Sequence, residues 1–132
     1  MIGTRVAART PVMPSSRAAA IAVLSLRIAY GAALVAVPAR LSRGWLGPID
    51  APAGVALRGL GAREIAVHGV ALAAALRGAP LRPWLAVSIA GDLGDIAATA
   101  AAGSHLPEGA VAKTAAVAGG SALVTAAVAM VS

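Results

Sequence analysis

Four long apolar stretches, separated by short polar segments, dominate this sequence of 132 residues. They cover residues 18–37, 52–76, 83–102 and 109–131. An α-helix rises about 1.5 Å per residue, so a run of roughly 20 apolar residues crosses a hydrocarbon layer ~30 Å thick. Backbone N–H and C=O groups in that layer must be paired within the segment, which favours helices. The sequence therefore predicts an all-α fold, an integral membrane four-helix bundle in contact with the lipid bilayer.

The composition excludes a water-soluble domain and a disordered chain. Hydrophobic residues make up 59% of the sequence and charged residues only 12%, and the mean hydropathy is +0.84. Soluble domains have about 45–50% apolar and about 25% charged residues. The absence of cysteine excludes disulfides and thiol catalysis. The preference for alanine and arginine is typical of a bacterial, GC-rich coding sequence and favours the bacterial inner membrane as the location.

The chain divides into a tail and a membrane domain. Residues 1–17 are basic and polar, and we expect a disordered tail followed by a transmembrane domain at 18–132. Pro38 should end the first helix, and Asp50 should cap the second. Residues 39–49 are expected to form an interfacial segment with Trp45 at headgroup depth. The loops at 77–82 and 103–108 are short, so consecutive helices should be antiparallel neighbours.

The first apolar stretch has a signal-peptide alternative, with cleavage after residue 39. Arg27 interrupts the apolar run of that segment, so we expect the first helix to be retained.

The basic residues indicate an orientation. The formal net charge is +6, and all but one of the eleven basic residues are arginine. They flank apolar runs, which favours topology control over nucleic-acid binding. Five arginines lie in the tail and the 77–82 loop, against three basic residues on the opposite side. The positive-inside rule therefore predicts that both termini lie in the cytoplasm.

Charged residues inside the spans mark the candidate site. We expect an ionic cluster or ligand-binding site formed by Arg27, Arg58, Arg63, Glu64, His68, Asp92 and Asp95. A charge at the bilayer centre costs about 2.5–3.5 kcal/mol on insertion scales, so these groups should be packed inside the bundle and paired. The set has three arginines and three carboxylates. Asp92 lies near the midplane, and we expect its substitution to destabilise the protein the most.

The helix faces support an interior site. Ser88 and Thr99 extend the two aspartates of the third span into a narrow polar stripe. The neighbouring face of that span is small, with Val87, Gly91, Gly94 and Ala98, and allows close helix approach. On the second span, Gly61 shares a face with Glu64 and His68.

Two interpretations of these residues remain open. They form either a structural salt-bridge network that fixes helix register, or a polar cavity that binds a ligand or relays protons. The carboxylates and histidine could also bind a metal, but the nearby arginines oppose a cation, and we expect no metal, cofactor or catalytic residue.

The segment from Leu24 to Ala102 resembles a known group of proteins. The pattern Arg58-Gly59-Leu60-Gly61-Ala62-Arg63-Glu64, followed by Trp84 and Gly91-Asp92-x-x-Asp95, is similar to that of small actinobacterial four-span membrane proteins of unknown function. A similar module is fused to polyketide cyclase/dehydrase-like domains. The resemblance implies a membrane location and signature positions Arg63, Glu64, Asp92 and Asp95, but no established reaction.

The leading functional expectation is a non-enzymatic multi-pass membrane protein that binds a small or lipidic ligand. The alternatives are a small proton-coupled transporter, as a homo-oligomer, and a membrane anchor or partner subunit of another enzyme.

Overall fold

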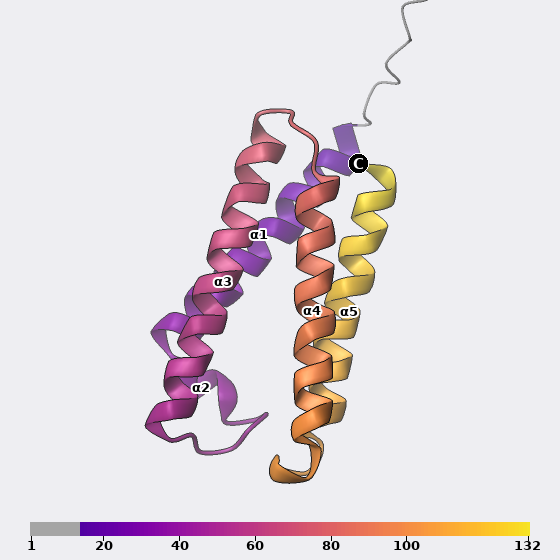
Figure 1. Ribbon diagram of the computed structural model, residues 1–132. Coiled ribbons are helices and arrows are strands. Elements are labelled where there is room, and N and C mark those ends of the chain that lie inside the picture. Colours follow the sequence, from indigo (N-terminus) through magenta and orange to yellow (C-terminus); the bar gives the residue numbers. More distant parts are fainter. Residues whose placement is uncertain (1–13) are drawn as a thin grey trace, which may run out of the picture.

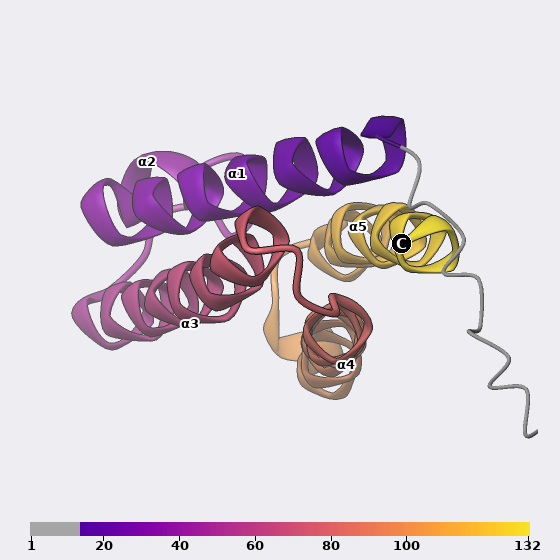
Figure 2. The same cartoon turned by 90° about the horizontal axis from the view of Figure 1, so that it is seen from above.

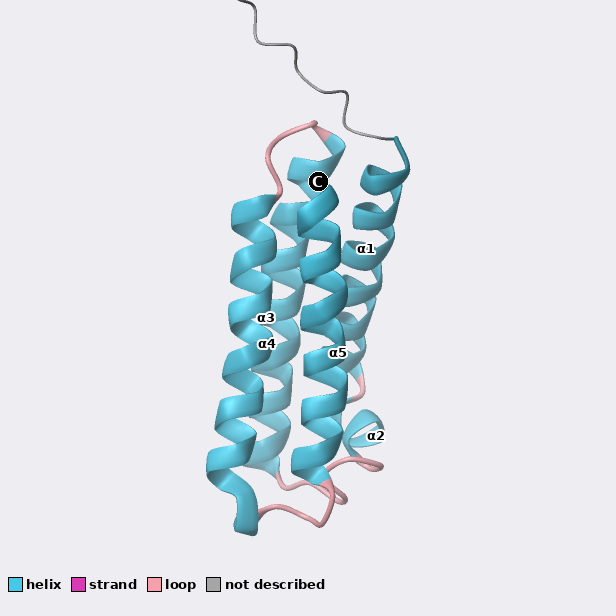
Figure 3. Ribbon diagram, turned by 90° about the vertical axis from the view of Figure 1, so that its right-hand side faces the viewer, coloured by secondary structure: helices cyan, strands magenta, loops and turns pink. Residues whose placement is uncertain are grey.

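The computed structural model describes residues 14–132, and every regular element in that range is helical (Figures 1 and 3). The long helices are α1 (Pro14–Ala36), α3 (Ala51–Leu76), α4 (Arg82–Ala102) and α5 (Ala110–Val131). A short helix α2 (Pro38–Ser42) and the 3-10 turn η1 (Gly103–His105) lie in the connections. All four long helices have the length and hydropathy needed to cross a membrane. The predicted all-α fold with four such helices is confirmed.

The helix ends follow from local chemistry. Pro38 lacks a backbone N–H and therefore cannot continue the hydrogen bonds of α1, which ends at Ala36. Pro38 is the first residue of α2. Asp50 caps α3, because its carboxylate accepts a hydrogen bond from the Ala53 backbone N–H at 2.9 Å. Helix α1 begins at Pro14, so residues 14–17, which were expected in the tail, are helical. The rest of the predicted tail lies outside the described residues.

The four long helices are arranged as two pairs. Helix α1 packs mainly against α3, and α4 packs mainly against α5 (Figure 2). Helices α3 and α4 are antiparallel, but they contact each other little despite their short connection (Figure 1). The expected antiparallel arrangement of consecutive helices is observed, and α3 and α4 pack together the least of the consecutive long helices. Short loops bring helix ends together, but they do not force packing along the whole helix length.

The two helix pairs meet tightly only at one end of the bundle. The apolar core lies at the end that holds the start of α1, the C-terminus and the α3–α4 connection, and it consists of Ala20, Leu24, Ala71, Ala75, Leu81, Leu85 and Val128. Toward the opposite end, where α2 and η1 lie, the pairs separate (Figure 1). The candidate site lies at the boundary between these two regions.

Candidate functional site

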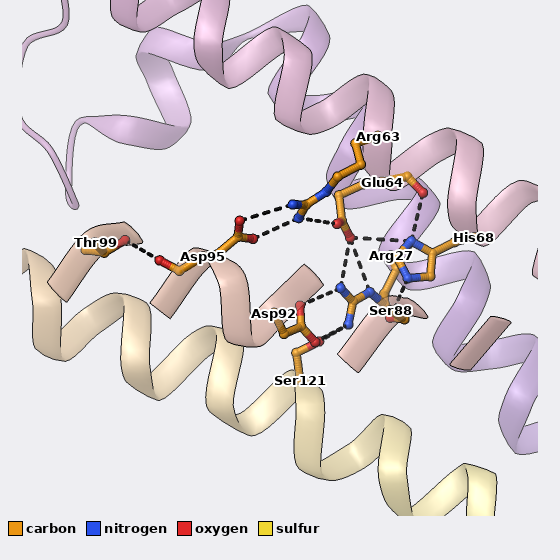
Figure 4. Close-up of polar contacts among 9 residues, drawn as sticks. All are labelled: Arg27, Arg63, Glu64, His68, Ser88, Asp92, Asp95, Thr99 and Ser121. Carbon is orange, nitrogen blue, oxygen red and sulfur yellow. Dashed lines mark hydrogen bonds and ion pairs between the residues drawn. The ribbon is translucent and has the colours of Figure 1, made fainter. Parts of the chain in front are cut away.

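Arg27 lies at the centre of the site and joins three other helices (Figure 4). Its guanidinium donates to Glu64 on α3 from Nε and Nη2, at 3.2 and 3.0 Å. It donates to both carboxylate oxygens of Asp92 on α4, at 2.8 and 2.7 Å. A fifth hydrogen bond goes to the hydroxyl of Ser121 on α5. All five N–H donors of this arginine are therefore used.

Arg63 forms the second centre of the site. Its guanidinium makes a two-pronged contact with Asp95, at 3.1 and 2.8 Å, and donates to Oε1 of Glu64 at 3.1 Å. Glu64 thus joins the two arginines. The Arg63 and Asp95 side chains are 39% and 32% exposed, whereas those of Arg27, Glu64 and Asp92 are 10% or less. The site therefore has a buried half and an open half.

His68 closes the buried half on the side of the apolar core. Its ring is 1% exposed. Nδ1 lies 2.7 Å from the Glu64 carbonyl oxygen and 3.4 Å from Oε2 of the same residue. Nε2 lies 2.8 Å from the Ser88 hydroxyl. Both ring nitrogens thus have partners, which explains how a polar ring is tolerated at this depth.

The structure brings together most of the residues that the sequence singled out. We call six of them the ionic cluster: Arg27, Arg63, Glu64, His68, Asp92 and Asp95. The expected pairing of the arginines on α1 and α3 with the aspartates on α4 is observed. Ser88 joins the cluster through His68, whereas the Thr99 hydroxyl donates to the Asp95 backbone carbonyl at 2.7 Å.

Arg58 was expected in the cluster but lies apart from it. Its Nε donates to the Val35 carbonyl at 3.2 Å, in an exposed position near the end of α1. It stands six residues before Glu64 on α3, more than one and a half turns away. Helical spacing placed it on the right face but at the wrong depth. Without it, the cluster contains two arginines and three carboxylates in the described part of the chain.

A close helix crossing holds Arg27 beside Glu64. A Cβ atom on Gly31 would lie 2.7 Å from the Gly61 carbonyl oxygen and 2.8 Å from the Glu64 Cβ. A Cβ on Gly61 would lie 2.5 Å from the Gly31 carbonyl oxygen. The backbones of α1 and α3 therefore touch at these glycines, one turn from both charged residues. Gly31 was not singled out from the sequence; its spacing of four residues from Arg27 is the signal that could have found it.

The face of α4 that carries small residues was expected to pack closely against another helix, but its two glycines have different surroundings. The space beside Gly91 holds the Arg63 guanidinium, whose carbon lies 3.6 Å from the position a Cβ would take, and Gly94 has open space. Gly91 accommodates a charged side chain, and neither glycine lies at a close contact between helix backbones.

A cavity of about 700 Å³ extends from the cluster into the open half of the bundle. Its charged end is formed by Arg27, Glu64, Asp92 and Asp95, and its other end by Leu41, Trp45 and Lys113. The walls between them are apolar and include Leu26, Leu60 and Val117. Cavities of roughly 300–1,000 Å³ hold drug-sized ligands. The site therefore has the volume and the amphipathic lining of a binding site.

Trp45 is held against α5 rather than projecting outward. Its indole Nε1 donates to the Thr114 hydroxyl at 2.9 Å, and that hydroxyl donates to the Ala110 carbonyl at 3.0 Å. The ring lines the cavity as a result. Its depth in a membrane stays a prediction.

Among residues 14–132, no group of three or more His, Asp or Glu side chains is arranged to hold a metal ion. The cluster carboxylates instead face guanidinium groups.

The fold and the site define a multi-pass membrane protein with buried ion pairs between its helices. Neither a protein-family model, nor a curated protein, nor a solved structure matches the chain. The resemblance to small actinobacterial membrane proteins therefore stays a prediction.

Proposed function

We propose that this protein binds a small amphipathic or lipidic ligand within the membrane, in the cavity between its two helix pairs. The observation that carries the proposal is the position of the cavity. Its apolar walls lead directly to the ionic cluster, and three intramembrane carboxylates line it. A cluster that served helix register alone could be closed off by packing, as the core at the other end of the bundle is. Here the open half of the cluster faces free space.

The amphipathic lining supports a ligand with one polar group and an apolar body. The polar group would lie at Asp95, the most exposed carboxylate of the cluster. The apolar body would lie along Leu60 and Val117. Ligand pockets in proteins commonly have this combination of apolar walls and a few convergent polar groups.

The proposed location is the bacterial inner membrane, with both termini in the cytoplasm. In the structure, Arg17, Arg77 and Arg82 lie at the same end of the bundle as the C-terminus, while Arg40 and Lys113 lie at the other end. Arg5 and Arg9 precede α1 in the sequence. The positive-inside rule supports this orientation.

Native mass spectrometry from mild detergent tests the binding function. The wild-type protein should retain a co-purified molecule. Ala118→Phe adds a ring to a residue that lines the cavity, and should remove that molecule. Ala127→Phe, on the exposed side of the same helix, is the matched control and should retain it. A wild-type protein without a bound molecule, or equal retention by Ala118→Phe, would contradict the proposal. The same spectra give the oligomeric state.

A small proton-coupled transporter is the second candidate, favoured by one observation. The cluster is open to the cavity on one side and sealed by the packed core on the other. A transporter in a one-sided access state has such an arrangement. This candidate predicts proton movement, read with an internal pH dye, when the recovered molecule is added to proteoliposomes. Binding without proton movement would exclude it.

A further inference from the structure

We infer that the cavity selects a hydrophobic organic cation, such as a quaternary ammonium or phosphonium, over a neutral or anionic molecule of the same shape. The inference rests on the proposed binding function and adds the chemical class of the ligand. It combines three features of the described residues: the charge balance of the ionic cluster, the full use of the Arg27 donors within the cluster, and the aromatic lining of the cavity.

The charge balance favours a cation. With His68 uncharged, two arginines face three carboxylates, which leaves the cluster with one excess negative charge. An unbalanced charge in a low-dielectric interior is costly, so an additional positive charge at this site is stabilised. Arg58, which would have balanced the set, binds the Val35 carbonyl instead.

The hydrogen bonds of the cluster disfavour an anionic ligand. The five N–H donors of Arg27 are all engaged with Glu64, Asp92 and Ser121, so this residue has no donor left for an anion. Asp95 lines the cavity and is the most exposed of the three carboxylates. The cluster therefore presents the negative charge of Asp95 to the cavity, and no free guanidinium donor of Arg27.

Lys113 does not reverse this balance. Its ammonium group donates to the Gly44 carbonyl at 2.6 Å, at the far end of the cavity. Asp92 and Ser121 share one nitrogen of Arg27, and Asp95 lies three residues beyond Asp92, toward the Lys113 end of the antiparallel α5. Lys113 and Ser121 are eight residues apart on α5, so Asp95 lies about 7–8 Å from the level of Lys113 along the bundle, which is beyond ion-pair contact.

The aromatic residues form the third feature. The whole sequence contains one tyrosine, two tryptophans and no phenylalanine. Tyr30 and Trp45 both line the cavity, whereas Trp84 does not. The faces of aromatic rings attract cations, and proteins use them to recognise quaternary ammonium groups. Trp45 lies at the end of the cavity that holds Lys113, so the ring relevant to a cation at Asp95 is that of Tyr30.

The test uses two probes of matched shape and opposite charge, tetraphenylphosphonium and tetraphenylborate, with the full-length protein in a nonionic detergent. Binding is measured by native mass spectrometry and by the fluorescence of Trp45 in a Trp84→Phe background. The phosphonium should bind, and the borate should bind at least about tenfold more weakly, the scale expected when a close attractive charge becomes repulsive in a partly solvated site.

Three variants assign the effect to residues. Asp95→Asn should weaken phosphonium binding about tenfold, because it removes a charge but keeps the side-chain shape. Tyr30→Leu should weaken phosphonium binding by a factor of about 2–10 through loss of the aromatic ring. This variant also tests the inference if Asp95→Asn fails to fold. Glu108→Gln removes an exposed carboxylate outside the cavity and should leave binding unchanged.

The inference is overturned if the borate binds as tightly as the phosphonium, or if folded Asp95→Asn and Tyr30→Leu both bind the phosphonium like the wild type. If neither probe binds, while Ala118→Phe still displaces a co-purified molecule, the cation preference is wrong and the binding function stands. If Ala118→Phe has no effect on probe or co-purified molecule, both fail.

Discussion

Replacing Arg27 by methionine should be the most destabilising single change in the ionic cluster. Methionine is unbranched, uncharged and close to arginine in volume, so the substitution removes the guanidinium without a large change in volume. The Arg27 side chain is 10% exposed, and its partners Glu64 and Asp92 are 6% and 5% exposed. Glu64 keeps Arg63 as a partner after the change. Asp92 keeps none, because Arg27 is its single ion-pair partner in the described part of the chain.

The magnitude follows from this loss of compensation. Removing one partner of a buried ion pair costs about 3–5 kcal/mol, because the other charge is left buried and unpaired. Asp92→Ala should cost about 3 kcal/mol, at the low end of that range, since Arg27 retains Glu64 and Ser121 and only two charge-assisted hydrogen bonds are lost. The structure therefore moves the expected point of greatest sensitivity from Asp92 to Arg27.

The free energy of unfolding can be measured by SDS titration in mixed micelles, with helicity followed by circular dichroism. Arg58→Met is the matched control, since Arg58 is an exposed arginine outside the cluster, and it should change stability by no more than about 0.5 kcal/mol. Arg27→Met combined with Asp92→Asn should recover about 1–2 kcal/mol, because the remaining carboxylate charge is removed. A cost below about 1 kcal/mol for Arg27→Met, or a cost equal to that of Arg58→Met, would refute the assignment of these contacts as structural ion pairs.

Two further predictions concern the helix crossing and the topology. Gly31→Ala should destabilise the protein by about 1–3 kcal/mol in the same titration, because its Cβ would overlap the Gly61 backbone, whereas Gly59→Ala, in open space, should be neutral or stabilising by up to about 1 kcal/mol. Equal effects would exclude the close crossing. Reporter fusions after Trp45, Ala79, Pro107 and Ser132 should alternate between periplasm and cytoplasm and end in the cytoplasm, and a periplasmic C-terminus would contradict the orientation.

The sequence predicted the helices better than their packing. Apolar length and proline positions placed all four spans to within a few residues, because a helix in lipid depends on local hydrogen bonding and hydropathy. Short loops predicted antiparallel neighbours, but they could not predict how extensively α3 and α4 pack together, because the side chains decide this. Gly31 and Gly61 bring α1 onto α3, whereas Arg63 occupies space beside Gly91 on the α4 side.

The sequence predicted most of the residues of the candidate site, but not the net charge of the site. Burial cost alone required that Arg27, Glu64 and Asp92 be paired, and they are. Charge counting along the sequence included Arg58 and suggested neutrality. Its distance along α3 from the cluster, and its contact with the Val35 carbonyl, leave the cluster with an excess carboxylate. The sequence does not decide whether a cavity is present, because an unfilled volume depends on how the helix pairs diverge.

The same side chains join the two helix pairs and line the cavity. Between α3 and α4 there is little direct packing, so the ion pairs Arg27–Asp92 and Arg63–Asp95 carry much of the attachment of α4 to the α1–α3 pair in the open half of the bundle. A cation that approached Asp95 would compete with Arg63 for that carboxylate. Binding in the cavity should therefore weaken the contact between the pairs, and the occupancy of the site and the separation of the helices would be coupled through one aspartate.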